Sequence, residues 1–85
     1  MRTVSKPIKM LAEFTPDNGA PRPRKFKWND GRGFEETVIV DEVVAIDDRA
    51  FQFVIYDCIS YYENSSRSYQ LIYWHGKHLW ELYKI

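Results

Sequence analysis

The sequence predicts a small all-β domain, built as a bent antiparallel sheet or a partly closed barrel of five to six strands. Two observations carry this prediction. Aromatic residues make up 16% of the 85-residue chain, and together with Val and Ile they favour strands over helices. Several short runs also alternate between apolar and polar side chains and are separated by turn residues, as antiparallel strands are. A chain of this length forms one domain with one core, residues 1–85.

The clearest predicted element is a β-hairpin over residues 68–85. Two apolar runs flank Gly76-Lys77, and glycine at the first loop position favours a type II′ turn, which needs φ > 0 there. Counting outward gives the pairs His75–His78, Trp74–Leu79, Tyr73–Trp80, Ile72–Glu81 and Leu71–Leu82. Because side chains alternate between faces, one face is predicted to be core. Its members are Leu71, Tyr73, Trp80 and Leu82, with Trp28 expected in the same core.

The opposite face of this hairpin is unusually apolar. It carries Ile72, Trp74, Leu79 and Tyr83. A monomer rarely exposes a contiguous apolar surface of this kind. We therefore expect this candidate interaction face to be covered, either by the chain's own N-terminal strand or by a second copy of the protein.

The first part of the chain contains two further predicted strands. Residues 1–7 are predicted to form a flexible tail, and residues 8–15 alternate like a strand, with a helix as the alternative. Pro21 and Pro23 remove two backbone donors, so the connection before residue 24 cannot be a central strand. Residues 24–28 alternate, with aromatic residues on one side and lysines on the other.

A second hairpin is predicted at residues 29–33, since Asp-Gly between alternating runs favours a tight turn. Its second arm, residues 34–46, is too long for one straight strand, so we expect a bend or bulge near Asp41-Glu42. A helical turn over residues 41–46 is the alternative. Residues 51–62 form another strand, in which Asp57 lies on the face of Phe53 and Ile55 and needs solvent or a buried partner.

The net charge is zero, but the two parts of the chain carry opposite net charges. Residues 1–33 hold eight Lys or Arg against three acidic residues, whereas residues 34–85 hold four against nine. The basic half interleaves cations with aromatic residues, a combination that binds phosphates and bases of single-stranded nucleic acid. The candidate nucleic-acid-binding residues are Arg22, Arg24, Lys25, Lys27 and Arg32. Clean alternation favours the alternative, in which Phe26 and Trp28 are core and the lysines protect an edge strand.

No pattern typical of a catalytic, cofactor-binding or metal-binding site stands out, so we expect no enzyme, no cofactor and no metal. His75 and His78 face each other across the predicted turn, but no further ligand lies at a supporting spacing. The acidic residues lack the spacing of a calcium loop, and neither a nucleophile elbow nor a phosphate-binding glycine loop occurs.

The single Cys58 excludes an internal disulfide and predicts a buried, reduced thiol. The N-terminal residues lack an apolar signal core, and no apolar run is long enough to span a membrane. These features favour a cytosolic protein without membrane attachment. The leading expectation is a non-enzymatic binding module that interacts with a protein partner or with a second copy of itself, and the alternative is weak single-stranded nucleic-acid binding through residues 22–32.

The chain also resembles small bacterial all-β domains to which no function is assigned. The resemblance lies in the order Phe26-x-Trp28, Gly31-Arg32, Phe34, Val38 and Val43, followed by Tyr69-x-Leu71-x-Tyr73, a glycine turn and Trp80-x-Leu82. It covers residues 24–85. Some such domains are similar to pieces found near error-prone DNA polymerases. The resemblance implies the fold, and no functional residue is carried over.

Overall fold

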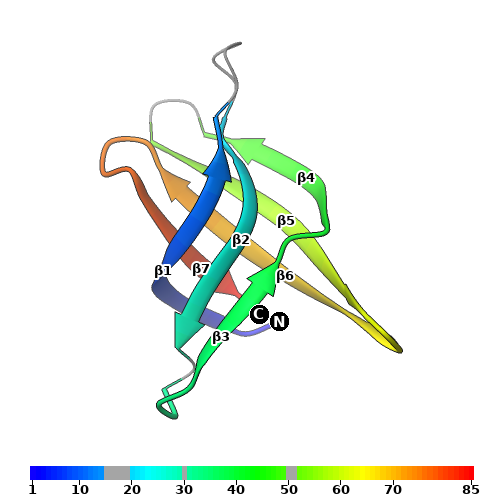
Figure 1. The fold of residues 1–85 in the computed structure, drawn as a ribbon. Coiled ribbons are helices and arrows are strands. Elements are labelled where there is room, and N and C mark those ends of the chain that lie inside the picture. The colour runs from blue at the N-terminus through cyan, green and yellow to red at the C-terminus, as the bar shows by residue number, and fades with distance from the viewer. Residues whose placement is uncertain (15–19, 30, 50–51) are drawn as a thin grey trace.

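The structure is a computed structural model that describes residues 1–14, 20–29, 31–49 and 52–85. The described part contains seven antiparallel strands and no helix, which confirms the all-β prediction with more strands than the five to six expected. The strands are β1 (Thr3–Glu13), β2 (Arg22–Asn29), β3 (Glu35–Ile39), β4 (Glu42–Asp48), β5 (Phe53–Tyr62), β6 (Ser65–Trp74) and β7 (Leu79–Lys84). Their order in the sheet is β3-β2-β1-β7-β6-β5-β4 (Figure 1).

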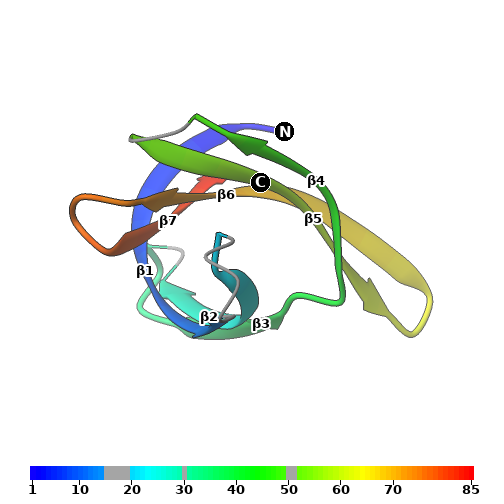
Figure 2. The ribbon, with the colours of Figure 1, turned by 90° about the horizontal axis from the view of Figure 1, so that it is seen from above.

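The sheet curls into a half barrel because two segments turn the corner between its halves (Figure 2). One is β1, which pairs with β7 through residues 3–8 and with β2 through residues 9–13. The other is the step from β3 to β4. There the Val40 N–H donates to the Arg24 carbonyl of β2 at 2.9 Å, and the Asp41 N–H donates to the Ile59 carbonyl of β5 at 3.2 Å. The chain thus crosses from one half of the sheet to the other within two residues.

This step confirms the bend expected near Asp41-Glu42. It also adds a strand, because the predicted arm over residues 34–46 divides into β3 and β4. Residues 42–48 are extended and not a helical turn. A bulge follows between Val43 and Ala45, so Val43 packs against the core while Val44 is 56% exposed.

Strand β1 begins at Thr3, whereas the sequence predicts a flexible tail over residues 1–7. Thr3 pairs with Lys84, and Arg2 and Ile85 exchange backbone hydrogen bonds of 2.8 and 2.9 Å. Pro7 lies in the part of β1 that pairs only with β7, so its missing N–H interrupts no second ladder. The far end of the chain supplies this pairing, which local alternation cannot reveal.

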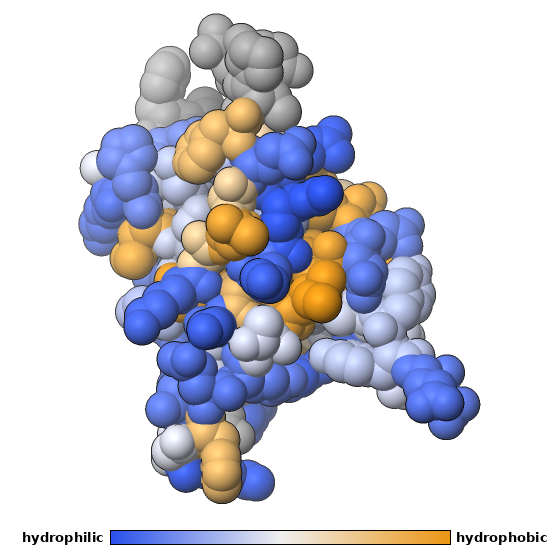
Figure 3. Space-filling model, in the orientation of Figure 1, coloured by the Kyte–Doolittle hydropathy of each residue, from blue (hydrophilic) through white to orange (hydrophobic). Residues whose placement is uncertain are grey.

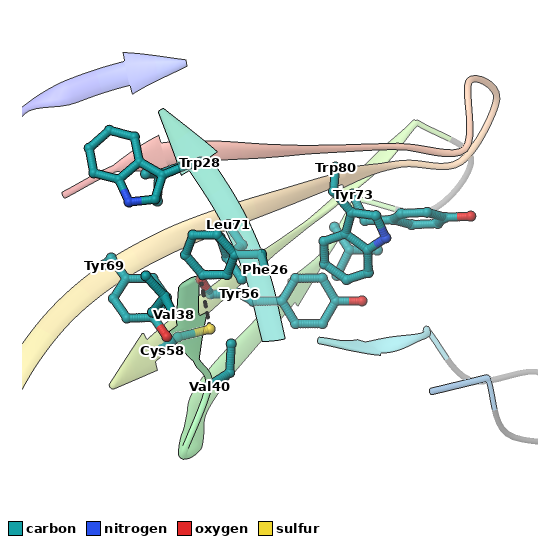
Figure 4. Close-up of a cluster of buried hydrophobic side chains, with 12 residues drawn as sticks. Phe26, Trp28, Val38, Val40, Tyr56, Cys58, Tyr69, Leu71, Tyr73 and Trp80 are labelled. Atoms are coloured by element: carbon teal, nitrogen blue, oxygen red, sulfur yellow. Dashed lines mark hydrogen bonds between the residues drawn. The ribbon is translucent and has the colours of Figure 1, made fainter. Parts of the chain in front are cut away.

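The core fills the concave side of the half barrel (Figure 4). Its buried members are Phe26, Trp28, Val38, Val40, Val54, Tyr56, Cys58, Tyr69, Leu71, Tyr73, Trp80 and Leu82. Trp28 and Trp80 are 5% and 6% exposed, so the prediction that they share one core is confirmed. In β5 the face of Val54 is buried, so Asp57 lies on the outer face and accepts a hydrogen bond from Gln70 Nε2 at 2.6 Å.

The last hairpin has the predicted register but a different turn. Tyr73 pairs with Trp80 and Trp74 with Leu79, as predicted. The loop between the strands spans residues 75–78, and its left-handed residue is His78, with φ +50°, and not Gly76. A four-residue loop of this kind leaves the same residues opposite each other, so the type II′ prediction is wrong while the predicted faces are right.

Candidate binding surfaces

The exposed cations of β2 lie on the outer face of the part of the sheet formed by β1, β2 and β3, where hydrophobic and hydrophilic patches alternate (Figure 3). Lys9 of β1 is paired with Lys27 of β2. In the next exposed row, Lys25 lies between Leu11 of β1 and Ile39 of β3. Leu11 and Ile39 are 61% and 60% exposed. We call this surface the cationic face, and it comprises Lys9, Leu11, Arg22, Arg24, Lys25, Lys27 and Ile39.

A bulge in β2 concentrates positive charge on this face. Lys25 pairs with Leu11 and Pro23 pairs with Ala12, which leaves Arg24 between them as the extra residue. Arg24 and Lys25 are consecutive in the sequence, yet both are exposed. In a regular strand one of the two would point into the core.

Two of the cations have acidic neighbours. Arg24 Nε lies 3.8 Å from Glu13 Oε2, and Lys27 Nζ lies 3.9 Å from Glu35 Oε1. All four side chains are more than half exposed, so these pairs contribute little to stability. They reduce the net positive charge of the cationic face without removing it.

Four of the five candidate nucleic-acid-binding residues lie on the cationic face, and Arg32 lies in the loop between β2 and β3. Lys9 was not among the candidates, because its proximity to Lys27 results from the pairing of β1 with β2. Phe26 and Trp28 are 1% and 5% exposed, so the alternative is right that they are core residues, but β2 lies between β1 and β3 and is not the edge strand that it expected. Neither ring is therefore free to stack on a base.

The candidate interaction face of the last hairpin is largely covered by the protein's own side chains. Ile72 is 6% exposed, and Trp74, Leu79 and Tyr83 are half-buried. The Trp74 ring packs against Phe53 of β5 with centroids 5.1 Å apart, and Lys77 Nζ lies 5.4 Å from its centroid. The N-terminal strand pairs with the edge of β7. The most exposed large apolar side chains therefore lie elsewhere in the described part of the chain.

The two histidines of the hairpin tip both lie beside Tyr73, since the His75 and Tyr73 ring centroids are 5.4 Å apart. His78 Nδ1 lies 3.1 Å from Tyr73 Oη, while His75 Nε2 lies 3.8 Å from Asp48 Oδ1. Among the described residues, no group of three or more His, Cys, Asp or Glu side chains is placed to hold a metal ion. The His78 contact lies within the hairpin, and the His75 contact reaches from its tip to β4.

Buried polar side chains bond to the backbone and to one another. Tyr56 Oη donates to the Pro21 carbonyl at 2.6 Å, and Tyr69 Oη lies 2.7 Å from Ser60 Oγ. Burial raises the pKa of both tyrosine hydroxyls, and burial followed by the charge of Asp57 raises the pKa of the Cys58 thiol to about 12. The thiolate is the nucleophilic form of cysteine, so this thiol is unreactive at neutral pH.

Comparisons of the chain with protein-family models, with curated proteins and with solved structures found no match. Within the described ranges, no helix has the length and apolar character needed to cross a membrane. Function is therefore inferred from the surfaces of this protein alone.

Proposed function

We propose that the protein is a non-enzymatic interaction module of the cytosol, which binds an acidic protein partner through the cationic face. One observation carries this proposal. Across three strands, Leu11, Lys25 and Ile39 form one row, and the two aliphatic side chains are 61% and 60% exposed. Such a row can make apolar contacts and a charge interaction with the same partner. The strands that carry it pack against the core with their opposite face.

A protein partner fits this row better than nucleic acid does. Carboxylates on the partner would pair with Lys25 and its neighbours, which speeds encounter and selects the partner. Apolar side chains on the partner would cover Leu11 and Ile39, which phosphates cannot do. The rings of Phe26 and Trp28, which would be needed to stack on bases, are buried.

Two features support the non-enzymatic and cytosolic parts of the proposal. The Cys58 thiol, with a pKa raised to about 12, is protonated at neutral pH and is a poor nucleophile. It is also free and buried, which suits a reducing compartment. The hydroxyls of Tyr56 and Ser60 serve to tie β5 to other parts of the fold.

A second function, weak binding of single-stranded nucleic acid, is favoured by a different observation. The bulge places Arg24 beside Lys25, and Lys9 lies opposite Lys27, so several cations occupy neighbouring positions. Such a cluster binds phosphates without reading bases, and its affinity falls steeply as salt rises.

Two pairs of substitutions on the cationic face separate these functions. A variant with Leu11→Ser and Ile39→Thr keeps the charges, and a variant with Lys25→Gln and Lys27→Gln keeps the aliphatic side chains. All four positions are exposed, so both variants are expected to fold. Glu63→Gln, in the exposed turn between β5 and β6, is the control.

The two readouts are selection from a displayed library of random short peptides and fluorescence anisotropy with a single-stranded oligothymidylate at low salt. We expect the wild-type protein and the control to enrich peptides that combine acidic and apolar residues, and both variants to lose this enrichment. The second function would be supported if the Leu11→Ser, Ile39→Thr variant still binds oligothymidylate and the Lys25→Gln, Lys27→Gln variant does not. The proposal is rejected if the wild-type protein enriches no acidic peptide.

A further inference from the structure

We propose a second binding site at the outer edge of β4, which accepts an extended basic polypeptide segment as an additional strand of the sheet. This site is independent of the cationic face. It carries the opposite charge, and it binds through the backbone of an edge strand instead of the face of a sheet.

The edge of β4 is open for pairing. In the described part of the chain, β4 is the last strand of the order and pairs with β5 alone. Backbone donors and acceptors on its other side therefore lack a strand partner, and such an edge is a template for another extended segment. Val44 and Ile46, near the middle of the strand, are 56% and 52% exposed.

The middle of β4 provides little of the protection that natural edges usually carry. Glu42–Asp48 contains neither lysine nor proline, and Val, Val, Ala and Ile fill its centre. The bulge at Val44 interrupts the ladder at one point only. The other edge strand, β3, is shorter, with five residues against seven, and begins with two glutamates.

Acidic residues at both ends of β4 decide which segment fits. Glu42 lies at one end, and Asp47 and Asp48 lie at the other. If two copies paired antiparallel through β4, these acids would face each other, and like charges directly opposite destabilise a strand pair. A segment with lysine or arginine at matching positions gains attraction in place of that repulsion.

The basic side chains beside these acidic residues leave the preference for a basic segment in place. Arg49 Nε lies 3.1 Å from Asp47 Oδ2, and His75 Nε2 lies 3.8 Å from Asp48 Oδ1. The Arg49 and Asp47 side chains are 63% and 53% exposed, so this pair is weak and exchanges readily with an incoming cation. Glu42 accepts a hydrogen bond from the Tyr61 hydroxyl, which brings no positive charge.

The pairing of β4 with β5 also indicates the pattern of the incoming segment. Ile46 is paired with the buried Tyr56, so it lies on the concave side, whereas Asp47 is paired with Ile55 on the outer side. Side chains of an added strand follow the same alternation. The matching segment therefore alternates apolar residues, beside Ile46, with basic residues, beside Asp47 and Glu42.

Short synthetic peptides can test this site by nuclear magnetic resonance titration of the isotope-labelled protein. The first peptide alternates Lys with Val or Thr, the second replaces each Lys by Glu, and the third carries a central Pro in the basic peptide. We expect only the first to bind well, with shifts of the amides of residues 42–48 and slower hydrogen exchange there. The proline peptide loses a backbone donor and bends away from the ladder.

Charge reversal on the protein provides the matched comparison. The variant with Asp47→Lys and Asp48→Lys is expected to bind the basic peptide about tenfold more weakly, or worse, because attraction becomes repulsion. Glu63→Lys, a charge reversal at another exposed position, in the β5–β6 turn, is expected to leave the affinity within about twofold, since distant exposed charges are screened. Circular dichroism establishes that both variants are folded.

Three results would overturn the proposal: equal binding of the acidic peptide, a footprint outside β4, or dimerisation of the free protein through β4 in light scattering. Each can occur whether or not the cationic face binds acidic peptides. The proposals for the two sites are therefore tested independently.

Discussion

Tyr73 and Trp80 face each other across the last hairpin, with ring centroids 4.9 Å apart. Tyr56 of β5 adds a third ring, 5.3 Å from that of Trp80. Leu79, the neighbour of Trp80, points to the outer face and is half-buried. The aromatic contacts therefore fix the register of the hairpin, since a shift by one residue would exchange Trp80 for Leu79 or Glu81.

Trp80→Ala is expected to unfold much of the protein. Truncation of a buried Trp costs about 3–5 kcal/mol, and a small domain has about 5–15 kcal/mol of stability in total. Leu79→Ala and His78→Ala should cost clearly less, because Leu79 is half-buried and His78 is exposed. Urea unfolding of the three variants measures how much free energy of unfolding each one loses. A larger loss for Leu79→Ala than for Trp80→Ala would refute the register.

Gly76→Ala is expected to leave the protein as stable as before or to stabilise it by about 0.4–1 kcal/mol. Gly76 lies outside the left-handed region, and a Cβ added there meets no atom within 4 Å. The left-handed residue is His78, so His78→Pro in the same loop should be severely destabilising. Thermal unfolding distinguishes this loop from a type II′ turn, in which Gly76→Ala would be the damaging change.

A buried hydroxyl pair holds the corner between β3 and β5. Ser60 Oγ donates to the Ile39 carbonyl, and since a serine hydroxyl has one hydrogen, Tyr69 Oη donates to Ser60 Oγ. Ser60→Ala leaves the Tyr69 hydroxyl and the Ile39 carbonyl without this partner and should cost about 1–3 kcal/mol. Tyr69→Phe should cost about 1 kcal/mol, because Ser60 keeps its bond to Ile39.

The double variant tests whether these two bonds act together. Ser60→Ala combined with Tyr69→Phe should cost less than the two single changes added, since no hydroxyl of the pair is then left buried and unpaired. Guanidinium unfolding of the wild-type protein, the two single variants and the double variant gives the coupling free energy between the two hydroxyls. Simple additivity would mean that the two hydroxyls contribute independently.

Alkaline conditions are expected to weaken the fold. Burial raises the pKa of the Cys58 thiol from 9.0 to about 12, and it also raises the pKa of the Tyr56 and Tyr69 hydroxyls. The unfolded chain ionises first, so the stability from Cys58 is complete below pH 9.0 and is lost as the pH rises toward 12. Each such group lowers the free energy of unfolding by up to about 1.4 kcal/mol per pH unit.

Urea unfolding from neutral pH to about pH 11 measures this loss. Cys58→Val removes the thiol while keeping a small apolar side chain, so its stability should fall less steeply just above pH 9.0. The tyrosine contribution, which begins near pH 10.0, should remain in this variant. A pH profile identical to that of the wild-type protein would show that Cys58 is not buried in its neutral form.

The sequence by itself determined the strands and the faces that alternation controls. Tyr73, Trp80 and Leu82 were assigned to the core from the spacing of apolar residues and the position of one turn. The bend at Asp41 followed from the length of residues 34–46. These features are local, because the direction of a side chain in a strand depends on its place in a period of two.

Only the tertiary structure decided which strands lie side by side and which edge is left open. Lys9 joins Lys27 because β1 pairs with β2, and Thr3 is held in place because β1 also pairs with β7 at the end of the chain. β4 is an edge because the sheet order ends there. Such pairings join residues far apart in sequence, and they form because a curled sheet buries apolar side chains of several strands in one core.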